Sequence, residues 1–461
     1  MQRKEIPRAG KTERDLSFGK ITGPKMARMA MAACTAMVCM ATAGCGDVFR
    51  PPESAISPVG PAATPARYAV AISDPGNGAQ GEFTIVDFGG DSVLNMTAIG
   101  VAPQYLTLGL NGAEAFVLNK DGSINTFGVS EYLQSNQVQT STLFPGANAT
   151  SLFAGNSNTY ITEPYTAGNA ELAVAAGSPP AVKQEISIGN NPVYIAANAG
   201  SSRIYAISQG ANAVTVLQTA TNTVSNVIPV GKGPVYGVMT SDNNRVFILN
   251  KTDGTASVIN TNTNQLDNTT PLITLGAGPV WADTYYNGSL LVTANSTGNS
   301  VSVVSIPLCS VVALPSNQNC NANNPTDAAN FGTVLGTVPV GTDPVMVTIL
   351  QDGTRAYVAN YNSGNVAGGS VSVVNLSTLT VSKTIPFDGQ TTNPNGTPST
   401  THGPLCNPNF IASIAGTPTG KVYVTCPNSQ YMTVIETDTD TIDTVINLQG
   451  NGVQLRVTAT Q

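Results

Sequence analysis

The sequence predicts an all-β protein that is built from repeated four-stranded antiparallel sheets. The clearest repeat runs from Gly189 to Pro234, where four short β-rich runs alternate with turns rich in Gly, Asn and Thr. Only 10% of the 461 residues are Asp, Glu, Lys or Arg, which leaves few charges for the exposed faces of long helices. Because one such sheet cannot bury both of its faces, the repeats have to stack, and we expect one large domain.

A Gly-x-x-Pro turn opens each repeat. It occurs at Gly100–Pro103, Gly189–Pro192, Gly231–Pro234, Gly276–Pro279 and Gly341–Pro344, with degenerate versions at Gly146–Ala149, Asn407–Pro408 and Gly450–Val453. Two positions after the proline there is usually a large side chain, namely Tyr105, Tyr194, Tyr236, Trp281, Met346 or Phe410. We expect these side chains to fill the space between the innermost strands of neighbouring sheets.

The second strand of each repeat carries a recurring tetrad of residues. Its eight copies begin at Tyr68, Phe116, Tyr160, Tyr205, Phe247, Leu291, Tyr357 and Tyr423. Tyr357–Asn360 and Tyr423–Cys426 resemble the Tyr-Val-Thr-Asn tetrad of the YVTN-type (YncE-like) β-propeller repeats, and Ala213–Gly231 is similar to the third and fourth strands of that family. The resemblance covers Tyr68 to Gln461. It implies a propeller of four-stranded blades, as in bacterial surface and periplasmic proteins of that type, and it implies no single activity.

The phase of the repeat predicts how the ring closes. The first repeat begins at Tyr68 with a second strand, whereas the chain ends with an extra innermost-strand pattern at Val453–Thr458. We therefore expect the C-terminal strand to complete the first blade, which leaves no unpaired inner edge. The tetrads indicate eight blades, while seven are commoner in the family and stay the alternative.

Two insertions interrupt the period, and each contains cysteine. They are Pro307–Phe331, with Cys309 and Cys320, and Asp388–Asn407, with His402 and Cys406. Cys406 precedes an innermost strand and Cys426 ends the adjacent strand, so a hairpin that turns near Thr417 brings the two sulfurs together. We expect the disulfides Cys309–Cys320 and Cys406–Cys426.

The N-terminus has the features of an export signal. Residues 1–28 are basic, and Met29–Ala43 is an apolar stretch of the length of a signal h-region, short for a membrane-spanning helix. Thr42-Ala43-Gly44-Cys45 resembles the lipobox of bacterial lipoproteins, whose cysteine becomes the lipidated first residue of the mature chain. Ordinary cleavage before Gly44 and a membrane-retained helix are the alternatives, and either Met1 or Met26 can be the start.

We expect three regions in the chain: a signal peptide over residues 1–44, a Pro-rich tether over 45–66, and the propeller over 67–461. The first 44 residues hold 8 of the 20 basic and 3 of the 27 acidic residues, which leaves 12 basic against 24 acidic residues and a formal charge of −12. An acidic body without a basic stripe argues against nucleic acid or an anionic membrane surface as a partner.

The search for catalytic and metal-binding motifs mostly excludes functions. One histidine, His402, cannot build a multi-histidine metal site, and there is no haem-attachment motif, nucleophile elbow, phosphate-binding loop or EF-hand loop. We therefore predict no catalytic residue, no metal and no cofactor.

The ligand-binding face is expected where the turns that enter innermost strands meet the turns that leave second strands. Its candidate residues are Asn119, Lys120, Glu163, Lys232, Asn250, Lys251, Asn295, Asn360 and Tyr361. Two of these places, Asn119–Gly122 and Asn250–Gly254, share the pattern Asn-Lys…Asp-Gly. Turn formation is the alternative explanation of this pattern, because Asn and Asp-Gly tolerate positive φ.

The sequence favours a monomeric, non-catalytic, lipid-anchored propeller that is exported to the bacterial cell envelope, periplasmic or cell-surface, and binds a protein or glycan partner there. The alternative is a propeller enzyme, such as a lactonase-like hydrolase or isomerase with its site at the central channel, and this alternative depends on analogy of fold alone.

Overall fold

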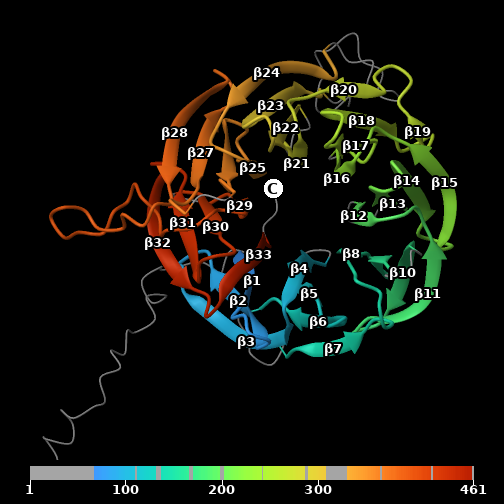
Figure 1. Ribbon diagram of the computed structural model, residues 1–461, viewed down its shortest axis with the longest axis horizontal. Coiled ribbons are helices and arrows are strands. Elements are labelled where there is room, and N and C mark those ends of the chain that lie inside the picture. The colour runs from blue at the N-terminus through green and yellow to red at the C-terminus, as the bar shows by residue number, and fades with distance from the viewer. Residues whose placement is uncertain are drawn as a thin grey trace, which may run out of the picture. The chain divides into compact units, whose positions relative to one another are not determined.

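The computed structural model describes residues 67–109, 112–130, 137–165, 170–197, 202–240, 242–285, 289–307, 330–363, 366–416 and 419–458. These residues belong to one compact unit. Their strands form eight antiparallel sheets, and the innermost strand of each sheet contacts the innermost strands of both neighbouring sheets, so the ring is closed (Figure 1). The structure therefore confirms the all-β fold and the eight blades. In this part of the chain we find no helix with the length and apolarity needed to cross a bilayer.

The blades are numbered here from the N-terminus, with the innermost strand given first. Blade 1 contains β33 (Asn451–Val457), β1 (Tyr68–Asp74), β2 (Gln80–Asp87) and β3 (Val93–Val101); blade 2 contains β4 (Pro103–Leu108), β5 (Glu114–Asn119), β6 (Ser123–Gly128) and β7 (Gln139–Thr142). Blade 3 contains β8 (Ser151–Ala154), β9 (Thr159–Pro164), β10 (Ala170–Ala176) and β11 (Ala181–Ser187); blade 4 contains β12 (Pro192–Ala196), β13 (Arg203–Ser208), β14 (Ala213–Gln218) and β15 (Thr223–Pro229).

The second half of the ring repeats this order. Blade 5 contains β16 (Pro234–Met239), β17 (Arg245–Asn250), β18 (Thr255–Asn260), β19 (Gln265–Leu266) and β20 (Leu272–Thr274); blade 6 contains β21 (Pro279–Thr284), β22 (Leu290–Asn295), β23 (Ser300–Ser305) and β24 (Thr333–Pro339). Blade 7 contains β25 (Pro344–Ile349), β26 (Arg355–Asn360), β27 (Ser370–Asn375) and β28 (Thr380–Pro386); blade 8 contains β29 (Phe410–Ile414), β30 (Lys421–Thr425), β31 (Tyr431–Glu436) and β32 (Thr441–Asn447).

The C-terminal strand closes the ring as predicted. β33 pairs antiparallel with β1, with Leu455 opposite Ala71, and thereby becomes the innermost strand of blade 1 (Figure 1). Leu455 is fully buried in a core cluster that β33 shares with blade 8. The inner edge that an unpaired β1 would leave open is therefore covered.

The Gly-x-x-Pro turn and the tetrad asparagine depend on each other. In blade 5, Asn250 Nδ2 donates to Thr255 Oγ1 at 3.0 Å and to Ser257 Oγ at 2.9 Å, and Ser257 Oγ accepts from the backbone nitrogen of Gly231 at 3.3 Å. A Cβ at Gly231 would lie 2.6 Å from Asn250 Nδ2, so a side chain at the turn has no room. Equivalent contacts form around Asn119, Asn295 and Asn360.

The tetrad tyrosine links its blade to the next one. Tyr160 donates to Asn222 Oδ1 at 2.9 Å, and Tyr357 donates to Asp440. Tyr205 meets Asn264 at 3.3 Å and Tyr423 meets Asp91 at 3.4 Å. All four partners stand in the turn between the third and fourth strands of the following blade, and all four have positive φ, a conformation that Asn and Asp tolerate better than most residues. The tyrosine of the tetrad thus connects neighbouring blades, and we call each such contact a tyrosine latch.

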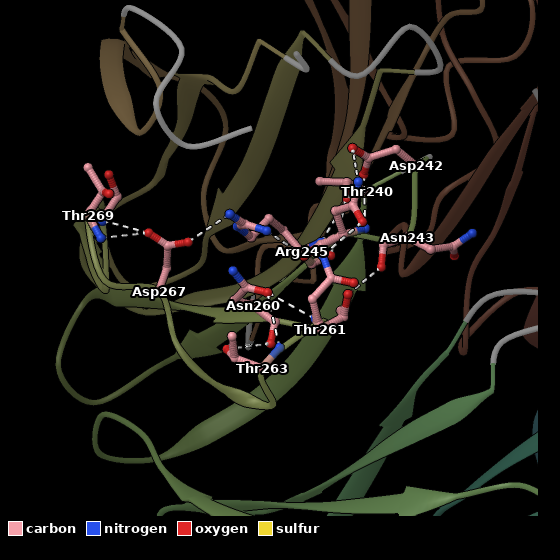
Figure 2. A network of polar contacts seen from close by, with 12 residues as sticks. Thr240, Asp242, Asn243, Arg245, Asn260, Thr261, Thr263, Asp267 and Thr269 are labelled. Atoms are coloured by element: carbon pink, nitrogen blue, oxygen red, sulfur yellow. Dashed lines mark hydrogen bonds and ion pairs between the residues drawn. The ribbon is translucent and has the colours of Figure 1, made fainter. Parts of the chain in front are cut away.

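Blade 5 departs from the pattern because its outer strand is interrupted between β19 and β20, which both pair with β18. Asp267 stands in the interruption, accepts hydrogen bonds from the backbone of Thr269 and Thr270 at 2.9 Å, and pairs with Arg245 of β17 at 2.9 Å (Figure 2). Both charged side chains are almost completely buried. Their mutual attraction offsets part of the desolvation cost, which either charge would carry in full if the other were absent.

Cys406 and Cys426 form the predicted disulfide, with their Cα atoms 5.9 Å apart. Phe410 pairs with Thr425 in the hairpin between the two cysteines, which brings Cys406 and Cys426 close together as predicted. Cys309 and Cys320 lie outside the described residues, as do Cys45 and the predicted signal and tether.

Candidate functional site

The aromatic side chains that follow the entry turns meet at the central channel. The Tyr194 and Tyr236 rings are 4.6 Å apart, the Tyr236 and Trp281 rings 4.1 Å apart, and the Trp281 ring meets the edge of Phe410 at 6.3 Å. We call these four residues the aromatic arc. They come from the innermost strands of blades 4, 5, 6 and 8. Because Trp281 reaches past blade 7 to Phe410, the arc fills part of the channel itself and not only the space between adjacent sheets.

Arg456 of β33 stands beside the arc. Its guanidinium carbon lies 5.6 Å from the centre of the Phe410 ring and 6.0 Å from that of the Trp281 ring, within the range of cation–π attraction. Its Nη1 donates to the Leu455 carbonyl at 3.0 Å. The ion pairs of the described residues use Arg245, Arg355, His402 and Lys421, so Arg456 has no carboxylate partner among these residues.

A cavity of about 230 Å³ opens against the arc, and we call it the axial cavity. Its walls include Trp281, Tyr236 and Tyr194 on the aromatic side and Asp283, Thr348, Ser413 and Arg456 on the polar side. The polar residues other than Arg456 belong to blades 6, 7 and 8. A cavity with apolar rings and a few convergent polar groups is the usual form of a small-molecule site.

The polar wall is built from bonds between innermost strands. Asp283 Oδ2 of blade 6 accepts from the backbone nitrogen of Ile349 in blade 7 at 2.8 Å, and Asp283 Oδ1 accepts from Thr284 N at 2.9 Å. The hydroxyls of Thr348 in blade 7 and Ser413 in blade 8 are 3.0 Å apart. These groups are held in place before any ligand arrives.

Burial raises the pKa of Tyr236, and also that of Tyr194, well above the usual phenol range, while Arg456 acts in the opposite direction. The pKa of Tyr105, the equivalent residue of blade 2, is raised for the same reason. The phenols are therefore neutral at physiological pH and can both donate and accept hydrogen bonds in the channel.

The four asparagines among the predicted ligand-face residues are buried within their own blades. They are Asn119, Asn250, Asn295 and Asn360, each at most 3% exposed. Their amide nitrogens bond to the third strand beneath the entry turn, as described above for Asn250. The structure gives these asparagines a role inside the blade, and a contact with ligand stays a prediction.

The predicted lysines lie on the outer surface of the same face. Lys120 lines a hollow between blades 2 and 3 together with Phe144, which is 52% exposed, and Lys251 lines the equivalent hollow between blades 5 and 6. The backbone of Lys232 donates to Asp253 at 2.7 Å, and the backbone of Tyr361 bonds to Asp343. None of these residues lines the axial cavity.

Glu163 is the most unusual of the predicted residues because it replaces the tetrad asparagine in blade 3. It is fully buried, Oε2 accepts from the Tyr165 hydroxyl at 3.3 Å, and Oε1 has no hydrogen-bond partner in the described structure. The position that Ser257 fills in blade 5 is Ala173 in blade 3, so the hydroxyl that would bond this oxygen is missing. Burial, and then the charge of Glu185, raises the pKa of Glu163 to about 8.

The described residues contain no group of three or more His, Cys, Asp or Glu side chains arranged to hold a metal ion. His402 contacts Asp388 at 3.0 Å in the second insertion, away from the axial cavity.

Sequence reasoning missed the polar wall: Asp283, Thr348, Ser413 and Arg456 are absent from the predicted site. The available signal was their position, because polar residues within innermost strands interrupt otherwise apolar runs. Trp281 and its aromatic neighbours were predicted as core residues, and Tyr236 is indeed 8% exposed.

No protein-family profile matches the chain, and no curated protein sequence matches it. Its fold resembles several solved structures. The dihydro-heme d1 dehydrogenase NirN, solved in complex with DHE, has a TM-score of 0.60 at 11% identity, with 84% of this chain and 74% of that chain covered. Apo AztD from Citrobacter koseri has a TM-score of 0.55 at 10% identity, with 85% and 97% covered.

A putative 6-phosphogluconolactonase from Bacteroides fragilis has a TM-score of 0.51 at 12% identity, with 86% of this chain and 99% of that chain covered. At such low identities these similarities establish the fold alone. The chain is an eight-bladed β-propeller, and the names of two of these neighbours, a dehydrogenase and a putative lactonase, denote different activities.

Proposed function

We propose that this protein is a non-catalytic propeller of the bacterial cell envelope whose axial cavity binds a glycan. The observation that carries the proposal is the opposition of the aromatic arc to a wall of hydrogen-bonding groups in one cavity. A sugar ring has an apolar C–H face and a rim of hydroxyl groups. The C–H face packs on aromatic rings, and the hydroxyl groups form hydrogen bonds with carboxylate and hydroxyl oxygens.

The size of the axial cavity restricts the ligand. Drug-sized ligands occupy pockets of roughly 300–1,000 Å³, and the axial cavity measures about 230 Å³. We therefore propose that it takes one sugar unit, such as the end of a chain, rather than a long oligosaccharide. The pre-formed polar wall lowers the cost of ordering side chains on binding.

We also propose that the protein is exported and anchored through a lipid on Cys45. The lipobox-like sequence before Cys45 and the Cys406–Cys426 disulfide, a bond typical of oxidising compartments, support this location. Cys45→Ala should move the protein from the detergent phase to the aqueous phase, because the acyl chains supply its membrane affinity. Unchanged partitioning of the variant would refute the anchor.

Calorimetric titration with a panel of neutral and acidic monosaccharides tests the binding function. We expect saturable binding of at least one sugar, and we expect Trp281→Leu to weaken it while Phe144→Leu, a change of an exposed aromatic outside the axial cavity, leaves it intact. Melting temperatures of both variants show whether they fold. Failure of every sugar to bind would refute the proposal.

A lactonase-like hydrolase is the alternative, because Asp283, Arg456 and two hydroxyls surround the same volume. Incubation with sugar lactones separates the two functions. Reproducible ring opening above the spontaneous rate, lost in Asp283→Asn, would favour the enzyme.

A further inference from the structure

Arg456 differs from three other buried or partly buried cations of the propeller, which have carboxylate partners. Arg245 pairs with Asp267 at 2.9 Å, Arg355 pairs with Asp440, and Lys421 pairs with Asp91. The fold therefore supplies a carboxylate to each of these cations. Arg456 lines the axial cavity without such a partner among the described residues.

Asp283, the acidic residue of the cavity wall, already bonds to the backbone. Asp283 directs Oδ2 to the backbone nitrogen of Ile349 and Oδ1 to that of Thr284. Its carboxylate therefore serves to hold innermost strands together.

The geometry of Arg456 fits an anionic ligand. An arginine has five N–H donors in a rigid fork that matches a carboxylate, and one nitrogen of Arg456 bonds the Leu455 carbonyl. The guanidinium carbon lies over the Trp281 and Phe410 rings, 6.0 and 5.6 Å from their centres. A charge held in place within a partly desolvated cavity binds an opposite charge more strongly than the same charge in water.

We propose that the axial cavity recognises a sugar that carries a carboxylate, with the sugar ring against the aromatic arc and the carboxylate on Arg456. This inference rests on the proposed glycan-binding function and names the chemical class of its ligand. The acidic surface of the protein gives no general attraction for such a ligand, since the chain beyond residue 44 has a formal charge of −12. Recognition therefore has to come from the local charge of Arg456.

Matched sugars test the proposal by calorimetry on the whole protein. The pairs are glucuronate with glucose, galacturonate with galactose, and mannuronate with mannose; glucose 6-phosphate is added as a second anion. We expect at least one uronate to bind more tightly than its neutral partner by a factor on the order of ten, the usual effect of a hydrogen bond to a charged group.

Two variants assign the effect to the guanidinium. Arg456→Gln should abolish the preference of the cavity for a uronate over its neutral partner, while Arg456→Lys, which keeps the charge, should retain part of that preference. Melting temperatures control for folding. Equal binding of acidic and neutral sugars, an unchanged preference in Arg456→Gln, or a preference for glucose 6-phosphate over every uronate would overturn this inference and leave the glycan-binding function standing. Absence of binding by any sugar would overturn both.

Discussion

Gln454 Oε1 accepts a hydrogen bond of 2.8 Å from the backbone nitrogen of Leu106. The C-terminal strand β33 therefore joins blade 1 to blade 2 through a buried side chain, in addition to its pairing with β1. On its other side, Asn409 of blade 8 donates to the Val453 carbonyl at 3.3 Å. One strand thus connects three blades.

Deletion of residues 450–461 should prevent stable folding. The deletion removes Leu455 and Val457 from the core, at roughly 1.5–3 kcal/mol per buried apolar side chain, and exposes the inner edge of β1. That loss is large beside a total stability of about 5–15 kcal/mol. Thermal unfolding and gel filtration measure the effect, and Leu455→Asp should resemble the deletion. A truncated protein that keeps its melting temperature would show that the ring closes in another way.

Removal of a tyrosine latch should have a small and local effect. Tyr160→Phe loses the hydrogen bond to Asn222 and leaves a half-buried acceptor, so we expect a decrease of about 1 kcal/mol in the free energy of unfolding. Tyr431→Phe is the control, because Tyr431 is 36% exposed. Phe116 and Phe247 occupy the same position in blades 2 and 5, so the fold accepts phenylalanine there. Equal stability of the two variants would mean that the latch does not stabilise the ring.

Glu163 should make stability fall as the pH rises. The unfolded chain ionises this carboxyl near its ordinary pKa of 4.5, whereas the folded protein keeps it protonated up to a pKa of about 8. Between these values the unfolded state binds fewer protons, so stability decreases with pH until the loss is complete above about pH 8. Glu163→Gln should flatten this dependence and raise the melting temperature most at pH 8 and above. The control is Glu114→Gln, and a variant whose pH profile matches the wild type would refute the assignment.

The cysteines of the mature chain should contain no free thiol. Peptide mapping of the unreduced protein should recover Cys406 linked to Cys426, as in the structure, and we predict Cys309 linked to Cys320 from the sequence. Thiol titration after denaturation without reductant checks the count. A free thiol, or a link between the two pairs, would contradict the prediction.

Much of the fold could be predicted because local sequence sets each blade. The Gly-x-x-Pro turn and the tetrad occur in nearly every repeat, and the unmatched ends at Tyr68 and Val453 revealed the closing strand. The interruption of blade 5 could not be predicted, because it depends on the distant pairing of Asp267 with Arg245. Both residues belong to blade 5, and a pair that does not recur in the other repeats leaves no periodic signal in the sequence.

The candidate site was harder to predict than the fold. Tetrad asparagines such as Asn250 look like surface residues in the sequence, yet they are buried because their amides satisfy the third strand beneath the turn. Arg456 and Asp283 come from distant parts of the sequence and line one cavity only when the ring closes. The sequence indicated Glu163 as an exception to the tetrad but not its burial.

The most direct test of the account uses Trp281, the single tryptophan of the sequence, which lines the axial cavity. Its fluorescence is titrated with the sugar that binds in calorimetry, in the wild type and in Lys120→Ala and Lys251→Ala, whose lysines line hollows outside the cavity. We predict that tryptophan emission changes with the midpoint found by calorimetry and that both lysine variants behave as the wild type. A sugar that binds without changing Trp281 emission, and whose binding depends on either lysine, would contradict the assignment of the site to the axial cavity.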